Sequence, residues 1–198
     1  EIIRDLDALP LPAWDLVDLA PYARMWRSRP GRFSLNHATS RGCPYGCNWC
    51  AKPIFGRQYV VQSPARAVES IAALHARGTP DHFWFADDIF GLTADWAEGF
   101  ADAMAATGLR VPFTIQTRAD LMGDARIRRG LVRAGLETAW LGAESGSQRI
   151  LDAMDKGLTV EETREAVRLL RADGVRVGLF LQYGYLGETM EDIRKTLA

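Results

Sequence analysis

Residues 33–50 read Phe33-Ser-Leu-Asn-His-Ala-Thr-Ser-Arg-Gly-Cys43-Pro-Tyr-Gly-Cys47-Asn-Trp-Cys50. The run Phe33–Ala38 is apolar and β-prone, and the stretch after it carries all three cysteines of the chain within eight residues. An odd number of cysteines so closely spaced cannot form a disulfide framework. Because thiolates favour zinc or iron–sulfur clusters over hard metal ions, we interpret this segment as a strand that leads into a metal-binding loop.

The cysteine spacing is C-x3-C-x2-C, and no fourth cysteine exists to close a site. Structural zinc sites normally have four Cys or His ligands, and a saturated cubane cluster has four cysteines. The three histidines, His37, His75 and His82, do not form a second ligand pair. The loop therefore favours a [4Fe–4S] cluster with one open iron that a small molecule can chelate. The alternative is a zinc site with His37 as its fourth ligand.

Four further β-prone runs alternate with helical patterns along the chain: His82–Ala86, Pro112–Ile115, Thr138–Gly142 and Val175–Leu181. Capping signals begin the intervening helices at Ser63-Pro64, at Thr93 and at a capping box that starts at Thr159, and Thr189-Met-Glu-Asp192 starts the last helix. A third helical pattern contains Ile127, Leu131 and Val132. We expect the glycines after four of the helices to end them in the left-handed conformation, namely Gly78, Gly108, Gly135 and Gly174. This alternation predicts an α/β fold of parallel βα units.

Polar residues follow each predicted strand: Thr39–Cys43, Asp87-Asp88, Gln116-Thr117-Arg118, Glu144-Ser145 and Gln182-Tyr183. In barrels the loops after the strands converge on the face where chemistry is done. The pattern therefore favours a partial (β/α) TIM-like barrel, truncated after about five βα units, over a doubly wound sheet, which the alternation alone also allows. We further expect Trp84 and Trp140, both in predicted strands, to line this barrel.

The composition excludes several classes of protein. Twenty-four basic and 25 acidic residues in 198 give a net charge of −1, which argues against a broad basic surface. The same balance favours no nucleic-acid partner. No apolar run is long enough to span a bilayer, so we expect no membrane segment. We also expect a cytoplasmic location. The basic run Arg126, Arg128, Arg129 and Arg133 is expected on the exposed faces of a solvated helix.

Residues 1–31 are expected to form a connector from an upstream domain, and residues 32–198 a core domain that is incomplete at its C-terminus. Four prolines between Asp5 and Gly31, at positions 10, 12, 21 and 30, prevent any long helix in the connector. Its apolar side chains are expected to pack on the surface of the core: Trp14, Leu16, Val17 and Leu19.

The cysteine motif, with Trp49 just before its last cysteine, resembles the signature of the radical S-adenosylmethionine (SAM) superfamily. Residues 142–152, with Met154-Asp-Lys-Gly157 and Thr159, resemble the fourth-strand region of that superfamily. Residues 182–189 resemble its fifth-strand motif, with Leu186 where proline is usual. The opening segment, residues 5–15, is similar to the connector of the cobalamin-binding branch. That branch includes anaerobic magnesium-protoporphyrin ester cyclases and cobalamin-dependent methylases.

This resemblance implies that Cys43, Cys47 and Cys50 bind a [4Fe–4S] cluster, whose open iron SAM caps. It also implies SAM contacts by residues after several strands: Asp87, Asp88, Arg118, Glu144, Ser145, Gly184 and Gly187. Which of the two aspartates faces SAM is open, because many members have a Gly-Gly-Glu-like run there. Arg118 would pair with the SAM carboxylate or a substrate acid, or else form a surface salt bridge. Glu144 would otherwise cap the following helix, together with Ser145 and Ser147.

The implied function is reductive cleavage of SAM to a 5′-deoxyadenosyl radical that abstracts hydrogen from a small molecule. Cobalamin-dependent methylation or ring formation is expected in the full-length protein. An electron donor such as flavodoxin or ferredoxin is the expected protein partner. The alternatives are a methylthiotransferase-like enzyme that acts on RNA and a non-catalytic zinc-binding interaction module.

Overall fold

The computed structural model describes residues 3–29, 31–51 and 56–198. Five parallel strands form the main sheet in chain order: β1 (Ser34–His37), β4 (His82–Phe85), β5 (Phe113–Thr117), β6 (Leu136–Glu144) and β7 (Arg176–Leu181). Each new strand is added to the same edge, so right-handed crossovers place the connecting helices on one face. A doubly wound sheet instead reverses its strand order. The prediction of an α/β partial barrel is therefore confirmed.

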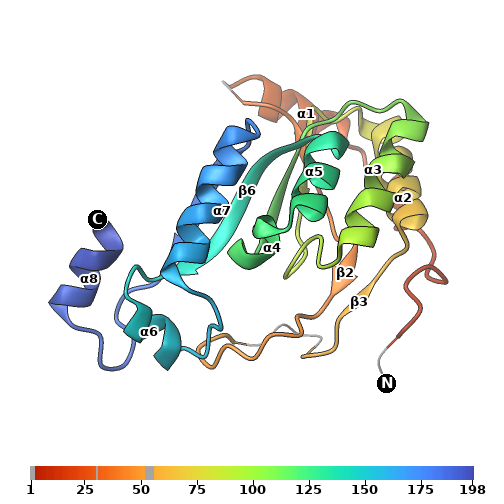
Figure 1. The fold of residues 1–198 in the computed structure, drawn as a ribbon. Helices are drawn as coiled ribbons and strands as arrows, with labels where there is room; N and C mark the ends of the chain where they lie inside the picture. The colour runs from red at the N-terminus through yellow and green to blue at the C-terminus, as the bar shows by residue number, and fades with distance from the viewer. Residues whose placement is uncertain (1–2, 30, 52–55) are drawn as a thin grey trace.

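The crossover helices cover one face of the sheet (Figure 1). They are α2 (Pro64–Gly78), α3 (Ala94–Thr107), α4 (Ala119–Gly123), α5 (Ala125–Ala134) and α7 (Val160–Ala172). Two short helices, α6 (Gln148–Ala153) and α8 (Met190–Leu197), lie beyond the carboxyl end of β6. No helix in the described part of the chain has the length and apolar character required to cross a membrane.

The predicted helix starts are confirmed at their caps. Ser63 and Thr93 accept hydrogen bonds from the backbone amides of Arg66 and Trp96. Thr159 and Thr189 form complete capping boxes at the starts of α7 and α8. Because each box satisfies amides that the helix itself leaves unpaired, these starts could be read from a few adjacent residues.

Three of the four predicted glycine caps adopt the left-handed conformation, at Gly108, Gly135 and Gly174. The prediction for Gly78 was wrong, because Thr79 adopts this conformation with φ of 42°. Gly78 instead makes room for the N-terminal segment, since a Cβ there would lie 2.9 Å from Leu19 Cδ1. This glycine is required by a distant contact that the local sequence does not reveal.

The two faces of the sheet carry different side chains. On the helix-covered face, Phe85 and Phe113 pack edge to face with centroids 5.2 Å apart, within a fully buried core that also includes Phe90 and Phe100. The opposite face carries Gln116, Trp140 and Phe180, which line a pocket. The core therefore fixes the sheet from one side and leaves the other side for ligands.

The N-terminal segment is more ordered than we expected. It contains a 3-10 helix, η1 (Trp14–Leu16), and helix α1 (Ala20–Arg27), which has Pro21 in its first turn. Trp14 and Leu19 pack against the core as predicted, but Leu16 is 82% and Val17 is 43% exposed. These two residues line an open hollow near the end of α2 instead. Pro30 lies outside the described residues.

The basic run on α5 is only partly solvated. Arg126 bonds to Asp95 and Glu98, and Arg133 lies 2.8 Å from Asp102. Arg128 is buried, contrary to our expectation, because it donates to Asp173 and to the Met122 carbonyl between α4 and the end of α7. Acidic partners thus neutralise much of this run, which argues against a phosphate-binding surface.

Candidate functional site

A pocket of about 330 Å³ lies at the carboxyl ends of the parallel strands. Its walls contain all three cysteines together with polar residues that follow three different strands: Asp87, Asp88, Arg118 and Glu144. The apolar part of the wall includes Trp140 and Phe180, whose stacked ring centroids are 5.0 Å apart. Trp140 thus lines the predicted face, whereas Trp84 does not reach this pocket. The structure therefore brings most of the predicted site residues together.

The cysteine loop is closed at its base by a short antiparallel pair, β2 (Ser40–Arg41) and β3 (Val60–Val61). The loop crosses the carboxyl end of the sheet beside α6 (Figure 1). Gly42 has φ of 81°, and a Cβ there would lie 1.8 Å from the Gln58 carbonyl oxygen. We did not predict this strand pair, although Val60-Val61 is a short β-prone run.

The three thiols face the same space but differ in exposure. Cys47 is buried, whereas Cys43 and Cys50 are half-buried. Burial raises the pKa of the Cys43 thiol, and the charges of Cys47, Asp88 and Cys50 raise it further. The pocket thus disfavours the ionised form of Cys43 in the free protein, and a cationic iron–sulfur core would stabilise that form in this three-cysteine donor set.

A single metal ion would require side chains that converge on one point. Within the described ranges, no three His, Cys, Asp or Glu side chains converge closely enough to hold one. A cubane cluster binds each cysteine at a different iron, so its thiols need not converge on one atom. The three cysteines therefore fit a cluster better than they fit a closed zinc site.

Asp87 is buried at the end of β4. Its Oδ1 accepts hydrogen bonds from the Thr39 amide, the Thr39 hydroxyl and the Ser40 hydroxyl, which ties β4 to the segment before the cysteines. Its Oδ2 is buried and has no partner among the described residues. Burial raises the pKa of Asp87 to about 6, although the bonds from Ser40 and Thr39 oppose the shift.

Asp88 is more exposed than Asp87 and lines the same pocket. Burial also raises its pKa, against a hydrogen bond from the Gly42 amide. The two neighbouring carboxylates thus differ in environment: Asp87 has a buried oxygen that no described residue bonds, whereas Asp88 has more access to water. Both remain candidates for ligand contact.

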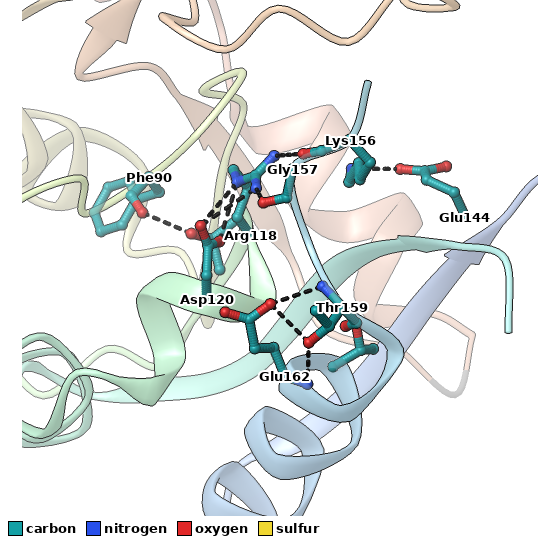
Figure 2. Close-up of polar contacts among 10 residues, drawn as sticks. Phe90, Arg118, Asp120, Glu144, Lys156, Gly157, Thr159 and Glu162 are labelled. Atoms are coloured by element: carbon teal, nitrogen blue, oxygen red, sulfur yellow. Dashed lines mark hydrogen bonds and ion pairs between the residues drawn. The ribbon is translucent and has the colours of Figure 1, made fainter. Parts of the chain in front are cut away.

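Glu144 is buried at the end of β6 with φ of 60°. Its Oε1 accepts a hydrogen bond of 2.9 Å from Lys156 Nζ, as Figure 2 shows. Lys156 is also buried and lines the pocket. Lys156 lies in the motif Met154-Asp-Lys-Gly157, but we did not predict it as a site residue. Its place in a quoted motif beside a predicted site carboxylate was the available signal.

Arg118 is 5% exposed, so it does not form the surface salt bridge that we considered. Its guanidinium donates to the carbonyls of Lys156 and Gly157, each at 3.0 Å, and to the Asp120 carboxylate (Figure 2). The guanidinium carbon also lies 3.8 Å from the centre of the Tyr45 ring, within the cysteine loop. Arg118 thus connects three parts of the pocket wall.

The other predicted site residues lie outside the pocket lining. Ser145 is buried beside α8, where its hydroxyl lies 3.1 Å from that of Thr196. Gly184 and Gly187 follow β7 with φ of 80° and 78°. The Gly184 amide donates to Glu188, so this turn is held by its own residues.

Comparison with known proteins adds an independent observation. A model of the protein family described as the radical SAM superfamily matches residues 38–198. An anaerobic magnesium-protoporphyrin IX monomethyl ester cyclase of Cereibacter sphaeroides is 30% identical over 197 residues, which cover 98% of this chain and 32% of the relative. A tRNA-2-methylthio-N(6)-dimethylallyladenosine synthase of Chlorobium phaeobacteroides is 31% identical, with 89% of this chain and 41% of the relative covered. The chain therefore spans less than half the length of these relatives.

Solved structures share the fold. The apo form of OxsB, a cobalamin-dependent SAM radical enzyme, aligns with a TM-score of 0.79 and 21% identity over 100% of this chain and 29% of its own. The radical SAM methyltransferase TsrM from Kitasatospora setae, with tryptophan and a SAM analogue bound, aligns with a TM-score of 0.77 and 22% identity. That match covers 91% of this chain and 35% of TsrM. At these identities the likeness establishes the fold alone.

Proposed function

The chain belongs to the radical SAM superfamily, and on that premise we propose that Cys43, Cys47 and Cys50 hold a [4Fe–4S] cluster with SAM at its open iron. When bound, the cluster supplies one electron that splits SAM into methionine and a 5′-deoxyadenosyl radical, which abstracts hydrogen from a small-molecule substrate. One observation carries this proposal above the others. All three thiols open into one pocket that also contains carboxylates from two different strand ends.

The described residues suggest how SAM is held. Asp87 Oδ2 is a buried acceptor with no partner in the described part of the chain, which suits the protonated amino group of SAM. Glu144 lines the same pocket at the end of β6, where it can accept from the ribose hydroxyls or the amino group. Asp88 provides a second acceptor nearer to solvent. Gly184, Gly187 and Ser145 belong to this proposal only as turn and support residues, since they do not line the pocket.

Apolar walls are the second requirement for radical chemistry. Trp140 and Phe180 form one wall and Ile89 contributes to another. The apolar faces of these rings reduce the contact of the reacting atoms with water on one side of the pocket. The chain's own contribution is therefore to bind the cofactors, orient them and provide this apolar side.

For the full-length protein we further propose cobalamin-dependent methylation or ring formation. Similarity to the cyclase and to OxsB supports this extension. The electron would come from a small donor such as flavodoxin or ferredoxin. We expect a cytoplasmic location, where cysteines stay reduced.

The test begins with anaerobic reconstitution of the full-length protein with iron and sulfide. We expect about four irons per chain and an electron paramagnetic resonance (EPR) spectrum of the reduced cluster that changes when SAM is added. The variant Cys43→Ala should lose iron and form no 5′-deoxyadenosine from SAM. Stoichiometric zinc without a SAM-sensitive cluster would instead support the zinc-binding module. Normal 5′-deoxyadenosine formation by Cys43→Ala would exclude the cluster assignment.

The methylthiotransferase alternative rests on the relative that modifies tRNA. The pairing of Arg126 and Arg133 with acidic side chains speaks against RNA contact through α5. A filter-binding titration of the full-length protein with tRNA, repeated at several salt concentrations, separates the two functions. Specific, salt-sensitive binding would favour the alternative.

A further inference from the structure

The cysteine loop rests on one turn of the chain. This turn, residues 153–157, joins α6 to the segment before α7 and contains two left-handed residues, Asp155 and Gly157. Asn48, between the second and third cysteines, donates from its backbone amide to Met154 and from its side chain to the Ala153 carbonyl. A loop residue is thus bonded to residues more than 100 positions later in the chain.

Arg118 makes a second connection between the same two segments. Its Nη1 and Nη2 donate to the carbonyls of Lys156 and Gly157, which lie on the turn. Its planar face lies over the ring of Tyr45, which lies between the first and second cysteines. Asp120 fixes the guanidinium in this orientation through Nε.

The donors of Arg118 are largely used by these contacts. A guanidinium has five N–H groups, and the carbonyls and Asp120 engage Nε, Nη1 and Nη2. A ligand carboxylate usually takes two parallel N–H groups of an arginine. No such pair remains free without breaking a contact to the turn or to Asp120.

We infer that Arg118 is a positioning residue that holds the cysteine loop on the turn 153–157 and thereby sets the spacing of the three thiols. This inference rests on the proposed function for its consequence in the enzyme, but the loop geometry itself exists without the cofactors. The role depends on the shape of the guanidinium rather than on its charge. Lysine keeps the charge, yet it cannot span two carbonyls and a carboxylate while stacking on a ring.

The experiment compares Arg118→Lys with the matched variant Arg126→Lys in the full-length protein. Arg126 lies exposed on α5, where it bonds to Asp95 and Glu98. The first measurement is the rate at which iodoacetamide alkylates Cys47 in the apoprotein, followed by mass spectrometry. Cys47 is 8% exposed while the loop is docked. We expect Arg118→Lys to raise this rate several-fold and Arg126→Lys to leave it unchanged.

The second measurement is the EPR spectrum of the reduced cluster before SAM is added. A displaced loop changes this spectrum in Arg118→Lys, and Tyr45→Leu should change it in the same way. The double variant should add little, because both substitutions break one connection. Asn48→Asp tests the other connection of the loop, since it places a carboxylate against the Ala153 carbonyl and Asp155. Tyr45→Leu decides the matter if Arg118→Lys does not fold, because it leaves Arg118 in place and removes the ring over which the guanidinium lies.

Unchanged alkylation rates and spectra would contradict the positioning role of Arg118. If Arg118→Lys and Tyr45→Leu alkylate at the wild-type rate and keep the SAM-free spectrum, Arg118 does not position the loop. Weaker SAM binding in Arg118→Lys alone would then identify it as a carboxylate ligand. A wild-type protein that forms no cluster contradicts the proposed function, whereas the alkylation rates still test the positioning role.

Discussion

Lys156 Nζ lies 2.9 Å from Glu144 Oε1, and both side chains are more than nine-tenths buried. Gly142 makes this approach possible, because a Cβ there would lie 2.8 Å from each of the two atoms. A buried ion pair costs desolvation, so its presence beside the three cysteines favours a role in the site over a role in stability. The pair also keeps the charge of Glu144 balanced before any ligand enters.

Removing one partner of the Lys156–Glu144 ion pair should lower the stability of the fold. Lys156→Met leaves the Glu144 carboxylate buried without its counter-charge, and we expect it to lower the free energy of unfolding by about 3–5 kcal/mol. Glu144→Leu combined with Lys156→Met should recover much of this loss, because no isolated charge remains. Urea unfolding of the apoprotein measures the stability of the single and the double variant. Lys195→Met removes an exposed i,i+4 pair with Glu191 and should leave the stability nearly unchanged, because solvent screens the pair. Equal costs for the two lysine variants would contradict the buried-pair interpretation.

Asp87 should make the protein less stable as the pH rises. Its pKa is about 6 in the folded state, against an ordinary value of 3.8, because burial disfavours the charged form. The folded state therefore binds the proton more tightly, and the stabilisation present below pH 4 is lost as the pH rises through about 6. Asp87→Asn keeps an oxygen acceptor for Thr39 and Ser40 but cannot ionise.

We therefore compare urea unfolding of the wild type and Asp87→Asn from pH 4 to pH 7.5. The stability of the wild type relative to the variant should fall by up to about 3 kcal/mol across this range. A difference that does not change with pH would show that the Asp87 carboxyl titrates normally.

His37 should have the opposite effect on the pH dependence of stability: it should make the protein less stable as the pH falls. Burial lowers its pKa to about 4 from 6.5, and the nearby Gln62 side chain only partly opposes the shift. The unfolded state then binds the proton more tightly, so the contribution of His37 is full above pH 6.5 and is lost as the pH falls through about 4. His37→Leu removes this titration. The wild type should lose up to about 3 kcal/mol relative to His37→Leu between pH 7 and pH 4. Parallel pH profiles for the two proteins would disprove this assignment.

The sequence predicted what short-range patterns encode. The five strands and the capped starts of α2, α3, α7 and α8 follow from apolar periodicity and from hydrogen bonds between close neighbours. The clustering of the cysteines with Asp87, Asp88, Arg118 and Glu144 follows from one rule, that parallel strands end on the same face.

Contacts between distant residues were not predictable in this way. Lys156 was missed because its partner lies 12 residues away across a loop and a helix. The burial of Arg128 depends on Asp173, 45 residues later. Gly78 resembled a helix cap because the local sequence does not show Leu19 packed against it. The functions of such residues are set by tertiary packing, which a single sequence does not display.

Gly42 provides a test of how the cysteine loop begins. This residue has φ of 81°, and a Cβ would lie 1.8 Å from the Gln58 carbonyl oxygen on the returning segment. Alanine disfavours this conformation, and backbone atoms cannot move aside as a flexible side chain would. Gly42→Ala must therefore separate the two sides of the loop base at β2 and β3, which shifts Cys43 directly after it. We expect a loss of about 1–3 kcal/mol in stability and a clear drop in iron per chain after reconstitution.

Gly46→Ala is the matched control from the same loop. Gly46 lies beside Cys47, and the nearest atom to its Cβ would be Arg57 Nη2 at 3.8 Å, an ordinary contact. We expect this variant to bind iron as the wild type does. Iron content, measured with the EPR spectrum of the reduced cluster, distinguishes the two alanines. If both variants bind iron normally, the loop base at β2 and β3 does not control the position of Cys43. If both variants lose iron, the loop requires flexibility throughout rather than space at Gly42.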